Sequence, residues 1–206
     1  VLFGQEGYAL AVNASIPNWF YEGDAVLQET ALSAQGRGRM PTFLKAYPTL
    51  WIEGKNYNWM KLRNGSLKDY VPNHYDLGYL LVNYGYEKYG PNFWQNITSD
   101  AAAFEGLFYP MQKAIKTYSG FRYKTFIKNT FDYYKGIYHI DSLKNINAEP
   151  GNKLQQRFSS VENYFYPVFI SSDSMLYLKS SYKATPAFYI KDSLGEHFLR
   201  NRDISS

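Results

Sequence analysis

Cysteine is absent from this sequence of 206 residues. Its absence excludes disulfide bonds, zinc sites with thiolate ligands and catalysis by a thiol. The sequence has no run of about 18 apolar residues, so it predicts no membrane-spanning helix. It also has no block of lysine and arginine, although the formal net charge is +4, and we therefore expect no nucleic-acid partner.

Histidine is also scarce, and none of the three histidines begins an HExxH motif. In many zinc peptidases that motif supplies two metal ligands and a general base from a single helix. His74, His139 and His197 are too far apart in the sequence to form a recognisable metal site of their own. These 206 residues alone are therefore expected to bind no stoichiometric zinc.

Aromatic residues, in contrast, are abundant, with 21 tyrosines, 14 phenylalanines and 4 tryptophans. Hydrophobic residues make up 45% of the chain and charged residues 19%, which favours a packed core over disorder. A tyrosine side chain combines a large apolar ring with a polar hydroxyl. Such residues suit a protein core, and they also suit the wall of a groove that binds sugar or peptide.

The first two-thirds of the chain has the periodicity and the stop signals of α-helices. Pro17 is expected in the first turn of a helix that ends before Gly36. Residues 51–73 are predicted to be irregular, with a tight turn at Asn64-Gly65. The spacing of apolar residues and glycines predicts further helices at 41–47, 74–89, from 91 onwards, at 109–118 and at 121–135.

The pattern changes towards the end of the chain, where apolar and polar residues alternate. This alternation predicts four short strands separated by turn residues, at 164–170, 175–179, 187–191 and 197–200. We therefore predict a mainly α fold with a short antiparallel β segment at the C-terminus. The expected organisation is a helical domain over 1–140, a linker over 141–154 and a β domain over 155–206.

One motif carries specific chemistry, the segment Trp19-Phe20-Tyr21-Glu22-Gly23-Asp24-Ala25 followed by Glu29. It resembles the W-x-x-E-G-x-A-x-x-x-E signature of gluzincin metallopeptidases, the aminopeptidase-N-like class in particular. The resemblance implies that Glu22 is the third zinc ligand, on a helix packed against the HExxH helix. Glu29 is expected on the same helical face, where it would orient a ligand or bind a substrate amine.

A second segment, His74-Tyr75-Asp76-Leu77-Gly78, resembles the downstream Y-x-K-G-A pattern of the same enzymes, with Leu77 in place of lysine. The resemblance implies that the Tyr75 hydroxyl donates a hydrogen bond to the tetrahedral oxyanion. His74 is expected near the site as a hydrogen-bond partner. Arg37 and Arg39 are candidates for binding a substrate carboxylate.

The order of these segments, together with Gly36-Arg37-Gly38-Arg39 and the strand-rich end, is similar to that of exported Bacteroidetes proteins. In those proteins a peptidase-like domain precedes a Tol-type β-propeller. The resemblance implies a periplasmic or cell-surface location, a peptide or protein substrate, and zinc held by the full-length protein. It also implies that the HExxH helix lies before Val1, so that residues 1–206 would be an inactive fragment.

The resemblance further implies that residues 155–206 are the first strands of an incomplete propeller. Open sheet edges pair readily with other strands, so we expect self-association through this segment. An alternative function stays open from the sequence alone. The richness in tyrosine, tryptophan and asparagine would also suit a non-catalytic surface module that binds glycan or peptide.

Overall fold

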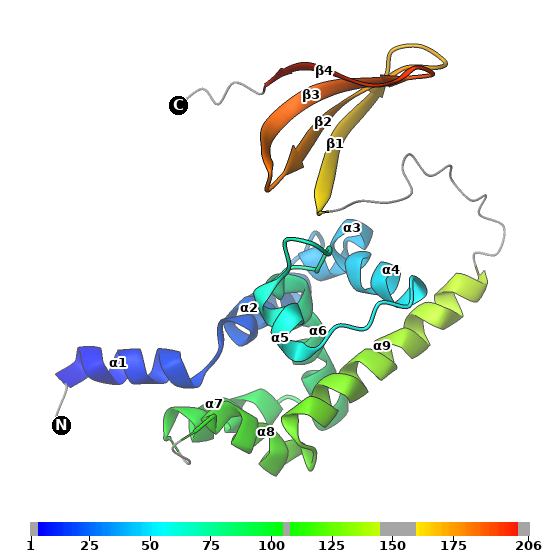
Figure 1. The fold of residues 1–206 in the computed structure, drawn as a ribbon. Helices are drawn as coiled ribbons and strands as arrows, with labels where there is room; N and C mark the ends of the chain where they lie inside the picture. The colour runs from blue at the N-terminus through cyan, green and yellow to red at the C-terminus, as the bar shows by residue number, and fades with distance from the viewer. Residues whose placement is uncertain (1–3, 105–107, 145–159, 202–206) are drawn as a thin grey trace. The chain divides into compact units, whose positions relative to one another are not determined.

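The structure is a computed structural model that describes residues 4–104, 108–144 and 160–201. The chain forms two compact units (Figure 1). The described residues up to Gly65 and from Pro72 to Lys144 form a helical unit. The segment Ser66–Val71 and the described residues from Ser160 form a β unit. The predicted mainly α fold with a C-terminal antiparallel β segment is confirmed.

The helices of the first unit agree with the predicted ones in most places. They are α1 (Gly4–Ser15), α2 (Asn18–Leu32), the short 3-10 helix η1 (Arg37–Arg39), α3 (Pro41–Leu44), α4 (Ala46–Ile52), α5 (Trp59–Asn64), α6 (His74–Tyr89), α7 (Phe93–Ala102), α8 (Pro110–Ser119) and α9 (Tyr123–Lys144).

Three local predictions were wrong. The region 51–73 contains helix α5, whose N-terminus is capped because the Asn58 side chain accepts a hydrogen bond from the Lys61 N–H at 2.9 Å. Gly65 has a φ of 75° and ends this helix, so Asn64-Gly65 is a helix terminus and not an isolated tight turn. Helix α9 continues past Gly136 to Lys144, because a single glycine inside a long helix costs only about 1 kcal/mol.

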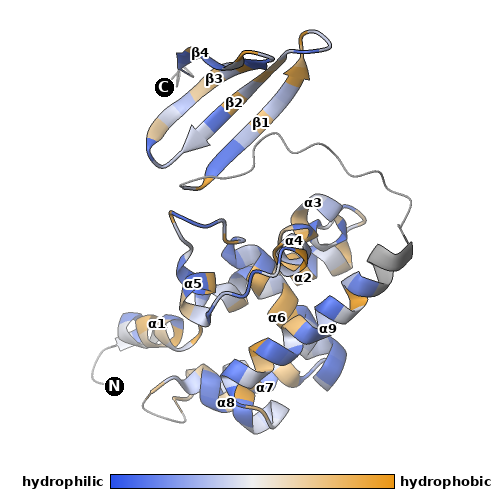
Figure 2. Cartoon of the chain, turned by 45° about the vertical axis from the view of Figure 1, so that its right-hand side comes forward, coloured by the Kyte–Doolittle hydropathy of each residue, from blue (hydrophilic) through white to orange (hydrophobic). Residues whose placement is uncertain are grey.

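Helix α6 forms the centre of the helical unit. Its apolar side chains are almost completely buried, with Leu77, Leu80, Leu81 and Val82 each at most 1% exposed. Figure 2 shows a hydrophobic stretch within α6. Helices α2, α7 and α9 all pack against it, and α2 makes the most extensive contact.

The contact between α2 and α6 depends on two glycines. A Cβ atom at Gly78 would lie 2.0 Å from the backbone oxygen of Trp19, and one at Gly23 would lie 2.2 Å from the backbone carbon of Gly78. Both distances are far below van der Waals contact, so only glycine fits at either position. The helices therefore pack backbone against backbone, which explains why the motif has glycine directly after Glu22.

We predict that Gly78→Ala destabilises the helical unit by about 3 kcal/mol, the upper end of the usual cost of overpacking, because the backbone of Trp19 cannot move aside alone. Gly136→Ala is the matched control, since nothing lies within 4 Å of a Cβ atom placed there. The control should stabilise α9 by about 0.5–1 kcal/mol. Urea denaturation of both variants measures the difference, and equal stability for the two would contradict this packing.

The β unit is one antiparallel sheet with the strand order β1-β2-β3-β4. Its strands are β1 (Glu162–Phe169), β2 (Met175–Ser181), β3 (Ala184–Asp192) and β4 (Gly195–Asn201), as the alternating pattern predicted. The segment Ser66–Val71 joins this unit, because the Leu67 carbonyl accepts a hydrogen bond from the Val161 N–H at 3.2 Å. The predicted linker lies mostly outside the described residues, although its first four residues extend α9.

Lys179 is the centre of a charged network on one face of this sheet. Its Nζ lies 2.8 Å from the Glu196 carboxylate and 3.2 Å from that of Glu162. Tyr164 donates a hydrogen bond to Glu162, and Tyr177 donates one to Glu196. Burial opposes the charged form of Lys179, but the hydrogen bonds to the two carboxylates outweigh it and raise the lysine pKa. The network joins β1, β2 and β4.

Large apolar side chains are exposed on both edge strands. Val168 and Phe169 on β1 and Phe198 on β4 are each more than half exposed. This surface is compatible with the predicted self-association, which stays a prediction, as does the propeller.

We predict that Lys179→Met destabilises the β unit by about 2–3 kcal/mol, because it leaves two half-buried carboxylates facing each other without a cation. The triple variant, with Glu162→Gln and Glu196→Gln added to Lys179→Met, should recover most of this loss. Thermal denaturation followed by circular dichroism measures the effect. If the triple variant is no more stable than Lys179→Met, repulsion between the two carboxylates is not the cause of the lost stability.

Candidate functional site

Glu22 lies where the motif predicted, on α2 about one turn after its first residue, Asn18. Its side chain is half-buried. No hydrogen bond or ion pair joins its carboxylate to another residue within the described ranges. The carboxylate is thus free to accept a ligand, while the adjacent Gly23 holds α2 against α6.

The structure brings Glu29 and Arg37 together. The Glu29 carboxylate accepts hydrogen bonds from the Arg37 backbone N–H at 3.1 Å and from the Arg37 side chain at 2.7 Å. The side-chain bond to Arg37 lowers the pKa of Glu29 below its ordinary value. The preceding Gly36 permits this arrangement, because a Cβ atom there would lie 2.3 Å from the Cα of Thr30. The pair thus fastens η1 to α2.

Arg39 is bound to the end of the same helix. Its guanidinium donates to the Thr30 carbonyl at 2.9 Å and to the Ser33 carbonyl at 3.3 Å. Basic side chains stabilise a helix C-terminus, where backbone carbonyls have no helical partner. Arg39 therefore has a structural role here, and its predicted role in binding a substrate carboxylate stays a prediction.

Tyr75 and His74 form the first turn of α6. The Asn73 side chain caps this helix by accepting hydrogen bonds from the N–H groups of Tyr75 and Asp76 at 2.9 and 3.1 Å. The His74 and Tyr75 rings lie 4.5 Å apart between centroids. The Arg37 guanidinium lies over the Tyr75 ring at 5.3 Å from its centroid.

Contacts at both ends of one face of α2 lead to the first turn of α6, which contains Tyr75. Asn18, Glu22 and Glu29 follow one another at i, i+4 and i+11, so they lie along one face of the helix. At one end of this row, Asn18 lines a hollow together with His74. At the other end, Glu29 binds Arg37, which covers Tyr75. Glu22 lies between these two points along the row.

A complete metal site does not form among the residues that the structure describes. Within them, no three histidine, aspartate or glutamate side chains converge in a way that could hold a metal ion. A catalytic zinc takes three protein ligands and keeps one position open. Glu22 could supply one of those ligands, and the others would have to come from outside the described residues.

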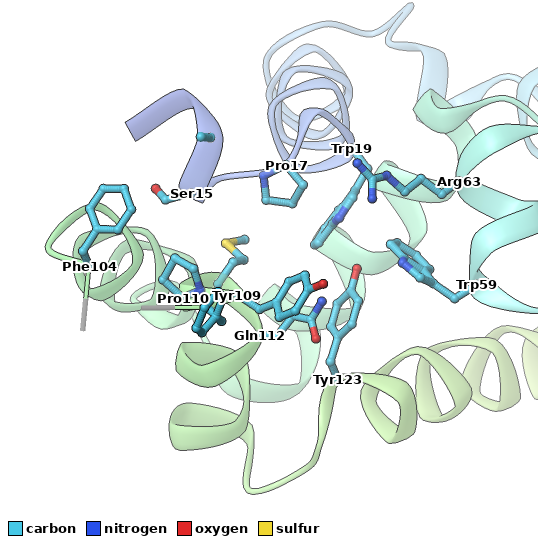
Figure 3. Close-up of a pocket in the computed structure, with 13 residues that line it drawn as sticks. Ser15, Pro17, Trp19, Trp59, Arg63, Phe104, Tyr109, Pro110, Gln112 and Tyr123 are labelled. Carbon is cyan, nitrogen blue, oxygen red and sulfur yellow. The ribbon is translucent and has the colours of Figure 1, made fainter. Parts of the chain in front are cut away.

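The helical unit also has a groove that the sequence motifs did not indicate. It consists of two adjoining cavities of about 480 and 520 Å³ that share several lining residues, among them Trp59, Tyr109, Gln112 and Tyr123. Trp19 and Arg63 complete the wall of the first cavity (Figure 3). We call these six residues the aromatic groove. They come from α2, α5, α8 and the start of α9, so only the high aromatic content could have suggested such a feature.

Two polar groups are enclosed behind the wall of the aromatic groove. They are the indole N–H of Trp19, a residue only 4% exposed, and the hydroxyl of Tyr123. Burial raises the pKa of Tyr123 well above 10, and a hydrogen bond with the Trp19 N–H and the charge of Arg63 offset this only in part. The two groups therefore face each other inside the packed wall, and neither is open to the groove.

A scan against protein-family models, a search of curated proteins and a search of solved structures each found no match. No helix within the described residues is long and apolar enough to cross a membrane.

Asp76, next to Tyr75, is a buried carboxyl that the motif did not single out. It is 6% exposed, and its Oδ1 has no hydrogen-bond donor among the described residues. Burial raises the pKa of Asp76 to about 6 from an ordinary value of 3.8. Its position in the first turn of α6 favours the charged form, but the loss of solvent has the larger effect.

We predict that Asp76 makes the protein less stable as the pH rises. Because the folded pKa lies above the unfolded one, the stabilising contribution of protonated Asp76 is complete below about pH 4 and is lost as the pH rises through about 6. Asp76→Asn should thus be more stable than the parent by about 1–2 kcal/mol at about pH 7.5. The gain should shrink at about pH 4.5.

Urea denaturation at the two pH values measures this effect. Asp173→Asn, at an exposed turn of the β unit, is the control and should show no such pH dependence. A constant difference between Asp76→Asn and the parent across the two pH values would contradict the assignment.

Proposed function

We propose that the helical unit is part of a gluzincin-like zinc-peptidase domain, in which Glu22 is a metal ligand and Tyr75 contacts the substrate. The observation that supports this best is the position of the two residues about the contact between α2 and α6. Glu22 directly precedes Gly23, Tyr75 lies one turn before Gly78, and the two glycines are in backbone contact. Both functional residues are therefore tied to one rigid helix pair.

In this proposal each side chain has a distinct task. Glu22 offers a carboxylate from the rigid surface of a helix, a suitable position for a metal ligand. Bound zinc would supply an activated water for attack on a peptide carbonyl. Tyr75 would donate a hydrogen bond to the negative oxygen that develops on that carbonyl. Arg37, held by Glu29, covers one side of the Tyr75 ring and limits its movement.

The proposal requires two further zinc ligands, and a histidine pair from an HExxH helix outside residues 1–206 would provide them. A domain that never had such a helix would keep the same scaffold without catalysis. It would then be a binding-only module for peptide or glycan. The aromatic groove favours this second candidate, because it offers a ligand surface that uses neither Glu22 nor Tyr75.

We predict that a longer form of the protein that carries an HExxH helix binds one zinc ion and that Glu22→Gln lowers its zinc affinity at least tenfold, because a neutral amide is a weaker ligand than a carboxylate. Tyr75→Phe should keep the zinc but slow peptide hydrolysis by about 10²–10³, the usual loss for one oxyanion donor. Metal analysis by mass spectrometry and assays with peptide substrates measure the two effects.

Glu87→Gln, an exposed position near the end of α6, is the control and should change neither quantity. A full-length protein without zinc would contradict the enzyme proposal, and the binding-only module would then be the remaining candidate function. Full zinc content in the Glu22→Gln variant would show that the metal lies elsewhere.

A further inference from the structure

All the charged side chains that line the aromatic groove and its two cavities are basic among the described residues. Five basic side chains line them, namely Arg63, Lys113, Lys116, Arg122 and Lys124. No aspartate or glutamate is among the described lining residues. None of the five cations forms an ion pair with a described residue either. A concentration of unpaired positive charge along a groove attracts anionic ligands.

The groove also offers directed hydrogen-bond donors. The Arg63 guanidinium lines the first cavity beside Tyr123. Figure 3 shows the side chains of Tyr109 and Gln112 turned towards the same space from α8 and its N-terminal residue. A guanidinium together with neutral donors is well suited to a carboxylate, which can accept several hydrogen bonds at once.

Apolar contact is the third property of the groove. The rings of Trp19 and Tyr123 stack with centroids 6.2 Å apart, and Trp59 meets Tyr123 edge-on at 5.0 Å. Pro17, Pro110 and Met111 line the same cavity. Methionine and aromatic walls adapt to large apolar side chains, and a cavity of about 480 Å³ is large enough to hold one.

We propose that the aromatic groove is a binding site for acidic peptides that carry a large apolar side chain next to a carboxylate. The carboxylates pair with Arg63 and the lysines of α8, and the apolar side chain packs among Trp59, Tyr109 and Tyr123. This site is separate from the proposed metal ligand, so it operates whether or not the domain holds zinc. It would serve an enzyme as a substrate-docking surface and a non-catalytic module as its main site.

Other polyanions fit the groove less well. An acidic glycan would satisfy the cations but has no bulky apolar group for the wall formed by Pro17, Pro110 and Met111. A single-stranded nucleic acid would use stacking and charge, but its continuous backbone would favour an open row of stacking platforms. The Trp19 ring is nearly fully buried and does not provide one.

Isothermal titration calorimetry with acetyl-Glu-Phe-Glu-amide tests the proposal on the 206-residue chain. Acetyl-Gln-Phe-Gln-amide removes the charge from this peptide, and acetyl-Glu-Ala-Glu-amide removes the apolar side chain. We expect each change to weaken binding about tenfold or more, and the affinity of the parent peptide to fall with added salt. Quenching of tryptophan fluorescence should accompany binding, because two tryptophans line the groove.

Variants locate the site. Arg63→Gln and the double variant Lys113→Gln/Lys116→Gln should each lower the affinity about tenfold, as expected for the loss of charge-assisted hydrogen bonds. Lys45→Gln, an exposed lysine outside the groove, is the matched control, and Glu22→Gln should bind the peptide normally. Circular dichroism verifies that each variant is folded.

The same titrations with other polyanions distinguish a peptide site from a glycan or nucleic-acid site. Tighter binding of a trigalacturonate or a short oligothymidine than of the acidic peptide would overturn the assignment to peptides. Absence of saturable binding, equal affinity for the charged and neutral peptides, or an equal loss in the Lys45→Gln control would each overturn the site. If Glu22→Gln leaves zinc binding unchanged, the metal proposal is wrong but the peptide-binding result is unaffected. The two proposals therefore fail independently.

Discussion

The backbone contact between Gly23 and Gly78 is the constraint on which the helical unit depends. It draws α2 and α6 closer than any side chain would permit, and it buries the hydrophobic length of α6. Trp19 is placed by the same contact, since its carbonyl lies against Gly78. The contact therefore sets the position of the Glu22 carboxylate, the first turn of α6 and one wall of the aromatic groove at once.

The charged residues next to this contact work mainly to hold the scaffold. Glu29 and Arg37 bind each other, and Arg39 closes the C-terminus of α2. Two glycines allow the loop to lie directly on the helix, because a Cβ atom at Gly36 or Gly38 would collide with Thr30. Arg37 then reaches Tyr75 through a cation–π contact. A motif that resembles a catalytic signature can thus keep its residues for structural reasons even where catalysis is absent.

Two buried polar features stand out among the described residues of the helical unit. Burial disfavours the charge of Asp76, whose Oδ1 meets no donor among those residues, and the Trp19 N–H and Tyr123 hydroxyl are enclosed together behind the aromatic groove. Each unsatisfied buried group costs about 1–3 kcal/mol. A carboxyl such as Asp76 can lower this cost by taking up a proton.

Local sequence patterns by themselves determined the mainly α fold, most helix positions, the four strands and the place of Glu22 on α2. Those features follow from periodicity and stop signals within a few residues of each other. Only the tertiary structure decided the rest: helix α5, the extension of α9, the pairing of Glu29 with Arg37, and the aromatic groove. The groove unites side chains from Trp19 to Tyr123, and no local pattern records which distant residues share a surface, because packing of whole helices brings them together.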